Sequence, residues 1–262
     1  MSSPPRILLV NDDGIDAPGI VLLERLMRGF SDDIWVVAPD EERSGAGHSI
    51  SITHPIRVRQ RDARHFAVKG SPTDCALLGI HEFLGDHRPD ILISGINGGP
   101  NLAEDLTYSG TLCAVMEGAM LGIPSIALSQ VLSYGAHVHW EASEKYLPGV
   151  IEKLLSIKWS EGNFINVNVP NVPPNEISGV RLTTQGLRPA GTFKPARRID
   201  ERKVPYYWIK IAHTAGELIE GTDLEAIHDQ AVSVTPLRID MTDLEMHRKL
   251  ERLFAEETVI IP

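Results

Sequence analysis

Short apolar runs alternate with stretches of helical periodicity through the first two-thirds of the chain, and this alternation constrains the fold most. The apolar runs have the length of strands and cover residues 7–10, 34–38, 91–94, 125–128 and 164–169. Helical spacing between them covers residues 18–30, a stretch that starts at Ser71-Pro72, and residues 112–121 and 141–155. Strands that alternate with helices form a mostly parallel sheet with helices on both faces, so the sequence predicts an α/β core.

Two parts of the chain break this alternation. Residues 50–68 resemble a hairpin or a small antiparallel insertion. After about residue 180 we expect strands at 204–212 and 232–236 and a charged amphipathic helix at 242–256, with residues 186–204 as a surface loop that leads into an arm. We therefore predict a catalytic core over residues 1–185. Residues 186–262 would form a C-terminal β-hairpin/helix arm and elements that return to the core.

The composition excludes several classes of protein. No apolar run approaches the roughly 18 residues that span a bilayer, and the first apolar run is too short for a signal-peptide core, which favours the cytoplasm. The net charge of −10 argues against a sequence-independent polynucleotide-binding surface. Two cysteines, Cys75 and Cys113, lie in apolar helical patterns, which is typical of buried free thiols.

Polar side chains and glycines follow three of the predicted strands. Asn11-Asp12-Asp13-Gly14 follows the first strand, and the loop of residues 39–49, which contains Ser44 and His48, follows the second. After the third come residues 95–101, including Asn97 and Asn101, and then residues 108–111. Ligands of open α/β sheets bind at the carboxyl ends of the strands, so these segments are the candidate site.

The adjacent carboxylates Asp12 and Asp13 suggest a cation, because like charges at a buried strand end repel unless a cation lies between them. Oxygen donors from Asp, Asn and Ser suit Mg²⁺, Mn²⁺ or Ca²⁺ rather than zinc. An isolated Asp-Asp-Gly is more often a plain turn or helix cap, and the neighbouring polar segments favour the metal here.

Ser109-Gly110-Thr111 opens a predicted helix, where backbone N–H groups bind anions such as phosphate. Ordinary N-capping by Ser109 or Thr111 is the simpler interpretation, and it is compatible with phosphate binding. His48 is the one histidine in a candidate loop and could contact a substrate.

Four motifs together resemble the SurE (survival protein E) nucleotidase family. They are VNDDGIDAPGI, APDEERSGAGHSIS, KGSPTDC and SGINGGPNLAEDLTYSGTLCAVMEGAMLGIPSIALS, in this order. The later segments YYWIK and DLEAIHDQAVSVTPLRIDMT resemble the C-terminal region of that family more weakly. The resemblance implies a Rossmann-like core with an arm that swaps between subunits, in a homodimer or homotetramer.

The resemblance also implies the roles of individual residues. One divalent cation, Mg²⁺ or Mn²⁺, would be held by Asp12, Asp13, Ser44 and Asn97. Phosphate contacts map to Asn101, Ser109, Gly110 and Thr111. Gly98 departs from the family pattern, because many members carry a basic residue there, and this leaves all four metal-ligand positions intact.

The resulting hypothesis is metal-dependent hydrolysis of nucleoside monophosphates, with 3′-nucleotides and short polyphosphate as further candidate substrates. Water would attack in line, and Asp12 or Asp13 would orient or deprotonate it. A haloacid-dehalogenase-type phosphatase is a second hypothesis, although its usual D-x-D is not met by Asp12-Asp13-Gly14. A nucleotide-sensing oligomer without turnover is a third.

Overall fold

We describe residues 4–132, 135, 137–189, 193–211 and 216–255 of a computed structural model of the chain. The strands of the main sheet are β1 (Ile7–Val10), β2 (Ile34–Pro39), β3 (Arg57–Gln60), β4 (His65–Lys69), β5 (Ile91–Gly98), β6 (Ser125–Gln130), β7 (Asn163–Val169), β8 (Gly179–Leu182) and β11 (Ala231–Arg238). A separate two-stranded ribbon consists of β9 (Phe193–Ile199) and β10 (Pro205–Ile211). The α-helices are α1 (Pro18–Met27), α2 (Pro72–Leu78), α3 (Gly110–Met120), α4 (Trp140–Leu155), α5 (Asp223–His228) and α6 (Leu244–Ala255).

The main sheet is mostly parallel, as the alternation of strands and helices predicted. Its strand order is β3-β4-β2-β1-β5-β6-β7-β11-β8. Strands β4, β2, β1, β5, β6 and β7 pair in parallel, whereas β3 is antiparallel to β4 and β11 is antiparallel to β7. Strand β11, from near the end of the chain, therefore lies inside the sheet between β7 and β8. The interval that resembled an antiparallel insertion forms β3 and β4, which continue the edge of the main sheet.

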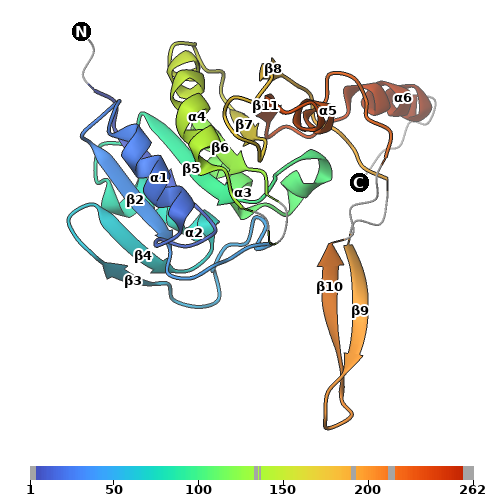
Figure 1. The fold of residues 1–262 in the computed structure, drawn as a ribbon, viewed down its shortest axis with the longest axis horizontal. Coiled ribbons are helices and arrows are strands. Elements are labelled where there is room, and N and C mark those ends of the chain that lie inside the picture. Colours follow the sequence, from blue (N-terminus) through green and yellow to red (C-terminus); the bar gives the residue numbers. More distant parts are fainter. Residues whose placement is uncertain (1–3, 133–134, 136, 190–192, 212–215, 256–262) are drawn as a thin grey trace.

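Helices cover both faces of the sheet (Figure 1). One core contains Leu23 of α1, Ile151 of α4 and alternate residues of the central strands. The other contains Cys75 of α2 and Leu112 of α3, packed against the opposite face. Both cysteines are free and buried, in agreement with the sequence prediction.

The start of α2 follows the local sequence closely. Ser71 is the N-cap, Pro72 takes the first turn, and the Ser71 hydroxyl accepts a hydrogen bond from the backbone N–H of Asp74 at 3.0 Å. The Asp74 carboxylate accepts in return from the Ser71 backbone N–H at 2.9 Å. These reciprocal bonds satisfy two N–H groups that the helix itself cannot use, which explains why the helix begins here.

Some elements differ from the sequence prediction. The segment interpreted as a surface loop, residues 186–204, contains strand β9. This strand is antiparallel to β10: Phe193 is paired with Ile211 at one end of the ribbon and Ile199 with Pro205 at the other. Strand β5 does not end at Ser94 but continues to Gly98 through an irregularity in its pairing with β6. Strand β8 and helix α5 were not predicted. The last residues of two predicted elements, 212 and 256, lie outside the described residues.

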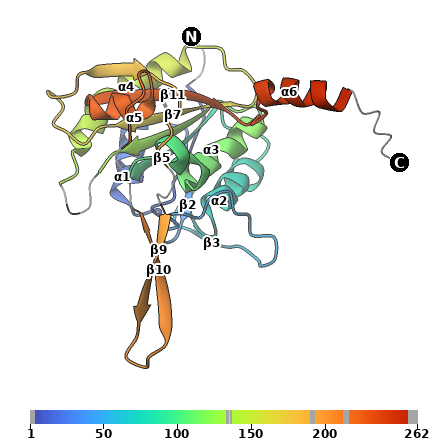
Figure 2. The same cartoon turned by 90° about the vertical axis from the view of Figure 1, so that its right-hand side faces the viewer.

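The ribbon β9–β10 and helix α6 project from the body of the molecule (Figures 1 and 2). Tyr207, Trp208 and Ile209 of β10 are each more than 60% exposed. Within the part of the chain that the structure describes, no helix is long and apolar enough to cross a membrane.

Candidate active site

A cavity of about 680 Å³ opens at the carboxyl ends of the central strands. Its walls come from the turn after β1, the loop after β2, the end of β5 and the segment before α3. The lining residues are Asp12, Ser44, Gly45, Asn97, Gly98, Gly99, Pro100, Asn101, Asp105, Tyr108, Ser109 and Ile209. Five of the eight residues predicted for the site, namely Asp12, Ser44, Asn97, Asn101 and Ser109, therefore lie in one cavity. Asp13, Gly110 and Thr111 lie behind its surface.

Asp12 is the most buried carboxylate of the cavity, with 4% of its surface exposed. Its Oδ1 accepts a hydrogen bond from the Thr111 hydroxyl at 2.6 Å. Burial raises the pKa of Asp12 to about 6; the hydrogen bond from Thr111 opposes the rise, and the nearby charge of Asp13 adds to it. Asp12 is therefore a carboxylate that gains strongly from a nearby positive charge.

Gly110 permits the close approach of α3 to this carboxylate. A Cβ at Gly110 would lie 2.9 Å from the Cβ of Asp12 and 2.9 Å from Cγ of Pro72. Both distances are too short for a real contact, so any larger residue would displace the start of α3. The N-terminus of α3 thus lies against Asp12, where the positive end of the helix dipole stabilises negative charge.

Asp13 occupies the same turn and faces the end of β5. Its Oδ2 accepts a hydrogen bond from the backbone N–H of Gly98 at 2.8 Å. Burial, and to a smaller degree Glu42, raises the pKa of Asp13 above its ordinary value, while the Gly98 bond opposes the rise. A Cβ at Gly98 would be 3.7 Å from this Oδ2, an ordinary contact. A Cβ at this position would therefore meet Asp13 without a clash.

The turn itself is fixed by residues on either side of the two carboxylates. The Asn11 side-chain amide donates to the carbonyl of Gly14 at 2.8 Å, and Gly14 has a φ of 103°, a backbone conformation that favours glycine. Asn11 is fully buried. The NDDG sequence thus presents two carboxylates from a rigid turn and is more than a helix cap, since Pro18 begins α1 four residues later.

Ser44 and Asn97 add neutral oxygen atoms to the cavity. The Ser44 hydroxyl donates to Oε1 of Glu42 at 2.9 Å, and the backbone N–H of Arg43 donates to the Asp12 carbonyl at 2.8 Å, which ties this loop to the turn after β1. The side-chain N–H of Asn97 donates to the Gly99 carbonyl at 2.8 Å. Since its nitrogen is engaged there, Oδ1 is the atom of Asn97 suited to a cation.

Asn101 and Ser109 form the opposite part of the wall. The Asn101 side-chain amide donates to the Ser129 hydroxyl at 2.9 Å, and its backbone carbonyl accepts from the side chains of Asn166 and Asn168. Asn101 is therefore held by two neighbouring strands, β6 and β7. Ser109 caps α3, accepting from the backbone N–H of Leu112 at 3.1 Å. The Thr111 hydroxyl is fully buried and donates to Asp12, so its direct role is to position that carboxylate.

Two lining residues lie outside the segments that the sequence indicated for the site: Asp105 and Ile209. Asp105 forms an ion pair with the guanidinium of Arg188 at 2.9 Å, and its acidic side chain just before the Ser109-Gly110-Thr111 stretch was a usable signal. Ile209 belongs to β10, and no local pattern connects it to this cavity. His48 is not among the lining residues; its Nε2 lies 2.6 Å from Oε1 of Glu117 on α3.

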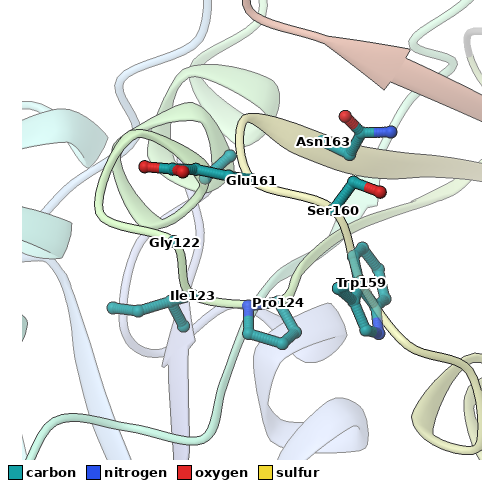
Figure 3. A pocket seen from close by; sticks show the side chains of 8 residues that line it. Gly122, Ile123, Pro124, Trp159, Ser160, Glu161 and Asn163 are labelled. Atoms are coloured by element: carbon teal, nitrogen blue, oxygen red, sulfur yellow. The ribbon is translucent and has the colours of Figure 1, made fainter.

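A smaller hollow of about 260 Å³ lies on the other side of the sheet from the cavity, at the amino ends of β6 and β7 (Figure 3). It is bounded by Gly122, Ile123 and Pro124 before β6 and by Trp159, Ser160 and Glu161 before β7. Glu161 is the one carboxylate that lines this hollow. The larger cavity is lined by the carboxylates of Asp12 and Asp105, and Asp13 is bonded to its lining residue Gly98. The chemistry of the described residues therefore concentrates at the carboxyl edge.

The chain was compared with known proteins. The family model described as survival protein SurE matches residues 7–192. A 5′-nucleotidase SurE of Parvibaculum lavamentivorans is 46% identical over 90% of this chain and 86% of its own length. One from Methylorubrum extorquens (strain PA1) is 48% identical over 91% and 94%. The crystal structure of the SurE protein from Aquifex aeolicus matches with a TM-score of 0.82 and 40% identity over 95% of this chain and 99% of that one. The order of the motifs, the strand order of the sheet and these similarities lead to one conclusion: the chain belongs to the SurE family.

Proposed function

We propose that this protein is a 5′-nucleotidase that hydrolyses the phosphate ester of nucleoside monophosphates. The single observation that carries the proposal is the convergence of Asp12, Ser44, Asn97, Asn101 and Ser109 in one cavity, backed by Asp13. Relatives named 5′-nucleotidase SurE match this chain along most of its length. A volume of about 680 Å³ falls in the range of small-molecule sites, so a nucleoside can be accommodated beside its phosphate.

We propose that Asp12, Asp13, Ser44 and Asn97 hold one divalent cation, Mg²⁺ or Mn²⁺. The donor set fits such an ion, because it offers carboxylate, hydroxyl and amide oxygens and no sulfur or imidazole. The raised pKa values of both aspartates fit as well, since burial raises them and a bound cation would favour the charged form of each carboxylate. When bound, the ion would polarise the phosphoryl group and neutralise charge that develops on its oxygens.

Other groups of the chain would bind the phosphate and transfer the proton. The side chains of Asn101 and Ser109 and the backbone N–H of Gly110 would bind the phosphate at the start of α3. Asp12 would accept a proton from water as the water oxygen bonds to phosphorus and the bond to the ester oxygen breaks; the nucleoside leaves with a proton on that oxygen. Thr111 would keep the Asp12 carboxylate oriented through its hydroxyl hydrogen bond.

A panel of substrates tests this function. We expect phosphate release from 5′-nucleoside monophosphates with Mn²⁺. The panel includes 3′-nucleotides and short polyphosphate, because the residues proposed to bind the phosphate do not contact the rest of the ligand. Binding without turnover for every nucleotide would identify a nucleotide sensor instead. A phospho-aspartate trapped on the protein would favour the haloacid-dehalogenase type of reaction and contradict direct attack by water.

We also propose that the chain assembles into a homodimer or homotetramer through its arm. A two-stranded ribbon is marginally stable alone in water, and the exposed Tyr207 and Trp208 side chains on β10 enlarge its apolar surface. Sedimentation should therefore detect a dimer or tetramer at micromolar concentration, and serine at both positions should shift it toward monomer. A stable wild-type monomer at that concentration would contradict this assembly.

The two buried free cysteines, Cys75 and Cys113, suit a reducing compartment. We accordingly propose a cytoplasmic location for the activity.

A further inference from the structure

A group of metal-ligating side chains lies outside the cavity, at the entry to α4. His137, His139 and Glu141 alternate along the chain, and their ligand atoms all lie within 4.8 Å of one another. None of the three lines the cavity that holds Asp12. The group therefore needs its own explanation.

The three side chains already interact. Nδ1 of His139 lies 2.7 Å from Oε1 of Glu141, and the rings of His137 and His139 meet edge to face with centroids 4.9 Å apart. All three remain accessible, since His137 and Glu141 are exposed and His139 is partly exposed.

Asn171 holds the backbone that presents the two histidines. Its Oδ1 accepts from the backbone N–H of His139 at 2.9 Å, and its Nδ2 donates to the carbonyl of His137 at 2.8 Å. Both bonds cross from the segment after β7 to the segment before α4. Glu141 is fixed separately, by its place in the first turn of α4. The three ligands thus start from an ordered backbone, which lowers the conformational entropy that binding would cost.

We propose that His137, His139 and Glu141 bind a borderline transition-metal ion, with Zn²⁺ as the first candidate, at a site separate from the oxygen-lined cavity. Two imidazoles and one carboxylate form a zinc donor set that leaves a fourth position for water. Tetrahedral zinc with bonds of 2.0–2.2 Å keeps ligand atoms about 3.4 Å apart. The present separations, from 2.7 Å to at most 4.8 Å, bracket that distance, so side-chain rotations suffice.

A metal ion bound at this site would restrain the segment that joins β6 to α4. The segment between β6 and α4 begins beside the cavity, where Leu132 Cδ2 lies 3.7 Å from the position of a Cβ on Gly98. The site lies at the other end of the same segment, at the start of α4. A bound ion would cross-link this end of the segment to the first turn of the helix.

Titration of the full-length protein with Zn²⁺, monitored by calorimetry after chelation and in the presence of excess Mg²⁺, tests the proposal. We expect one saturable zinc site per chain. His139→Gln, His137→Gln and Glu141→Gln should each weaken it at least tenfold. Asp12→Asn should retain it, and His87→Gln, which alters an exposed histidine on another loop, is the matched control and should bind as the wild type does. Co²⁺ provides a second measurement, because a tetrahedral nitrogen and oxygen site absorbs visible light far more strongly than an octahedral oxygen site.

Two results would overturn the proposal. One is wild-type protein that takes up no zinc under these conditions, and the other is zinc uptake that survives His139→Gln but disappears in Asp12→Asn. Since both readouts measure binding, they do not depend on nucleotidase activity. Failure here and failure of the proposed function are therefore distinguishable.

Discussion

Replacing Asp12 with asparagine is expected to reduce phosphate release to background and, at the same time, to stabilise the metal-free protein at neutral pH. The pKa of Asp12 in the folded state, about 6, lies above the ordinary value of 3.8 because the side chain is buried. This shift corresponds to about 3 kcal/mol at neutral pH. The contribution of protonated Asp12 to the free energy of unfolding is therefore complete below about pH 4, and it is lost as the pH rises from about 4 to above 6. Asparagine has no carboxylate to ionise, so the folded protein keeps this stability at neutral pH, and its side-chain oxygen can still accept from the Thr111 hydroxyl. Turnover is lost because asparagine lacks the negative charge that binds the cation and accepts a proton from water.

Asp13→Asn should change both properties in the same direction, with a smaller loss of turnover if Asp12 is the residue that handles the water. The measurement is paired: thermal unfolding without metal at pH 5 and pH 7, and phosphate release with saturating Mn²⁺. Asp86→Asn, in an exposed loop, is the matched control for a lost negative charge and should alter neither. If the two carboxylates serve only to stabilise the turn, the pattern inverts: apo stability falls by about 0.5–2 kcal/mol, as for the loss of a capping side chain, while turnover persists.

Exhaustive chelation is expected to abolish activity, and Mg²⁺ or Mn²⁺ should restore it far better than Zn²⁺. The reason is the donor set of Asp12, Asp13, Ser44 and Asn97, which contains oxygen alone. The same ions should raise the midpoint of thermal unfolding, since a ligand at a hundred times its Kd adds about 2.7 kcal/mol to the stability of the folded state. Activity and unfolding are measured on one preparation before EDTA, after EDTA and after each ion is added back.

The His139→Gln variant is the control for this experiment. It should show the same requirement for Mg²⁺ or Mn²⁺ as the wild type, because its substitution lies outside the cavity. Full activity after complete removal of metal would show that Asp12 and Asp13 do not act through a cation.

The parts of the fold that could be predicted are those where local sequence and tertiary structure agree. The alternation of apolar runs and helical periodicity predicts the central sheet, and Ser71 and Pro72 predict the start of α2, because capping depends on neighbours within three residues. The strand ends predict which segments meet, because parallel strands place their carboxyl ends along one edge.

The parts that could not be predicted depend on partners distant in the sequence. Strand β9 has no apolar run, and it is defined by its pairing with β10. The hydroxyl of Thr111 donates to Asp12, a residue 99 positions earlier, and no local pattern marks this contact. Ile209 reaches the cavity from the arm, and nothing near it in the sequence marks that contact.

The place of β11 in the sheet bears on how the chain is made. Ribosomes release a chain from its N-terminus, so β7 emerges long before residues 231–238, which pair with it. Until then one edge of β7 presents unpaired backbone N–H and C=O groups beside apolar side chains, a surface that can pair with strands of other nascent chains. Completion of this sheet is therefore a late event in synthesis, and a chain that ends before residue 231 leaves this edge of β7 unpaired.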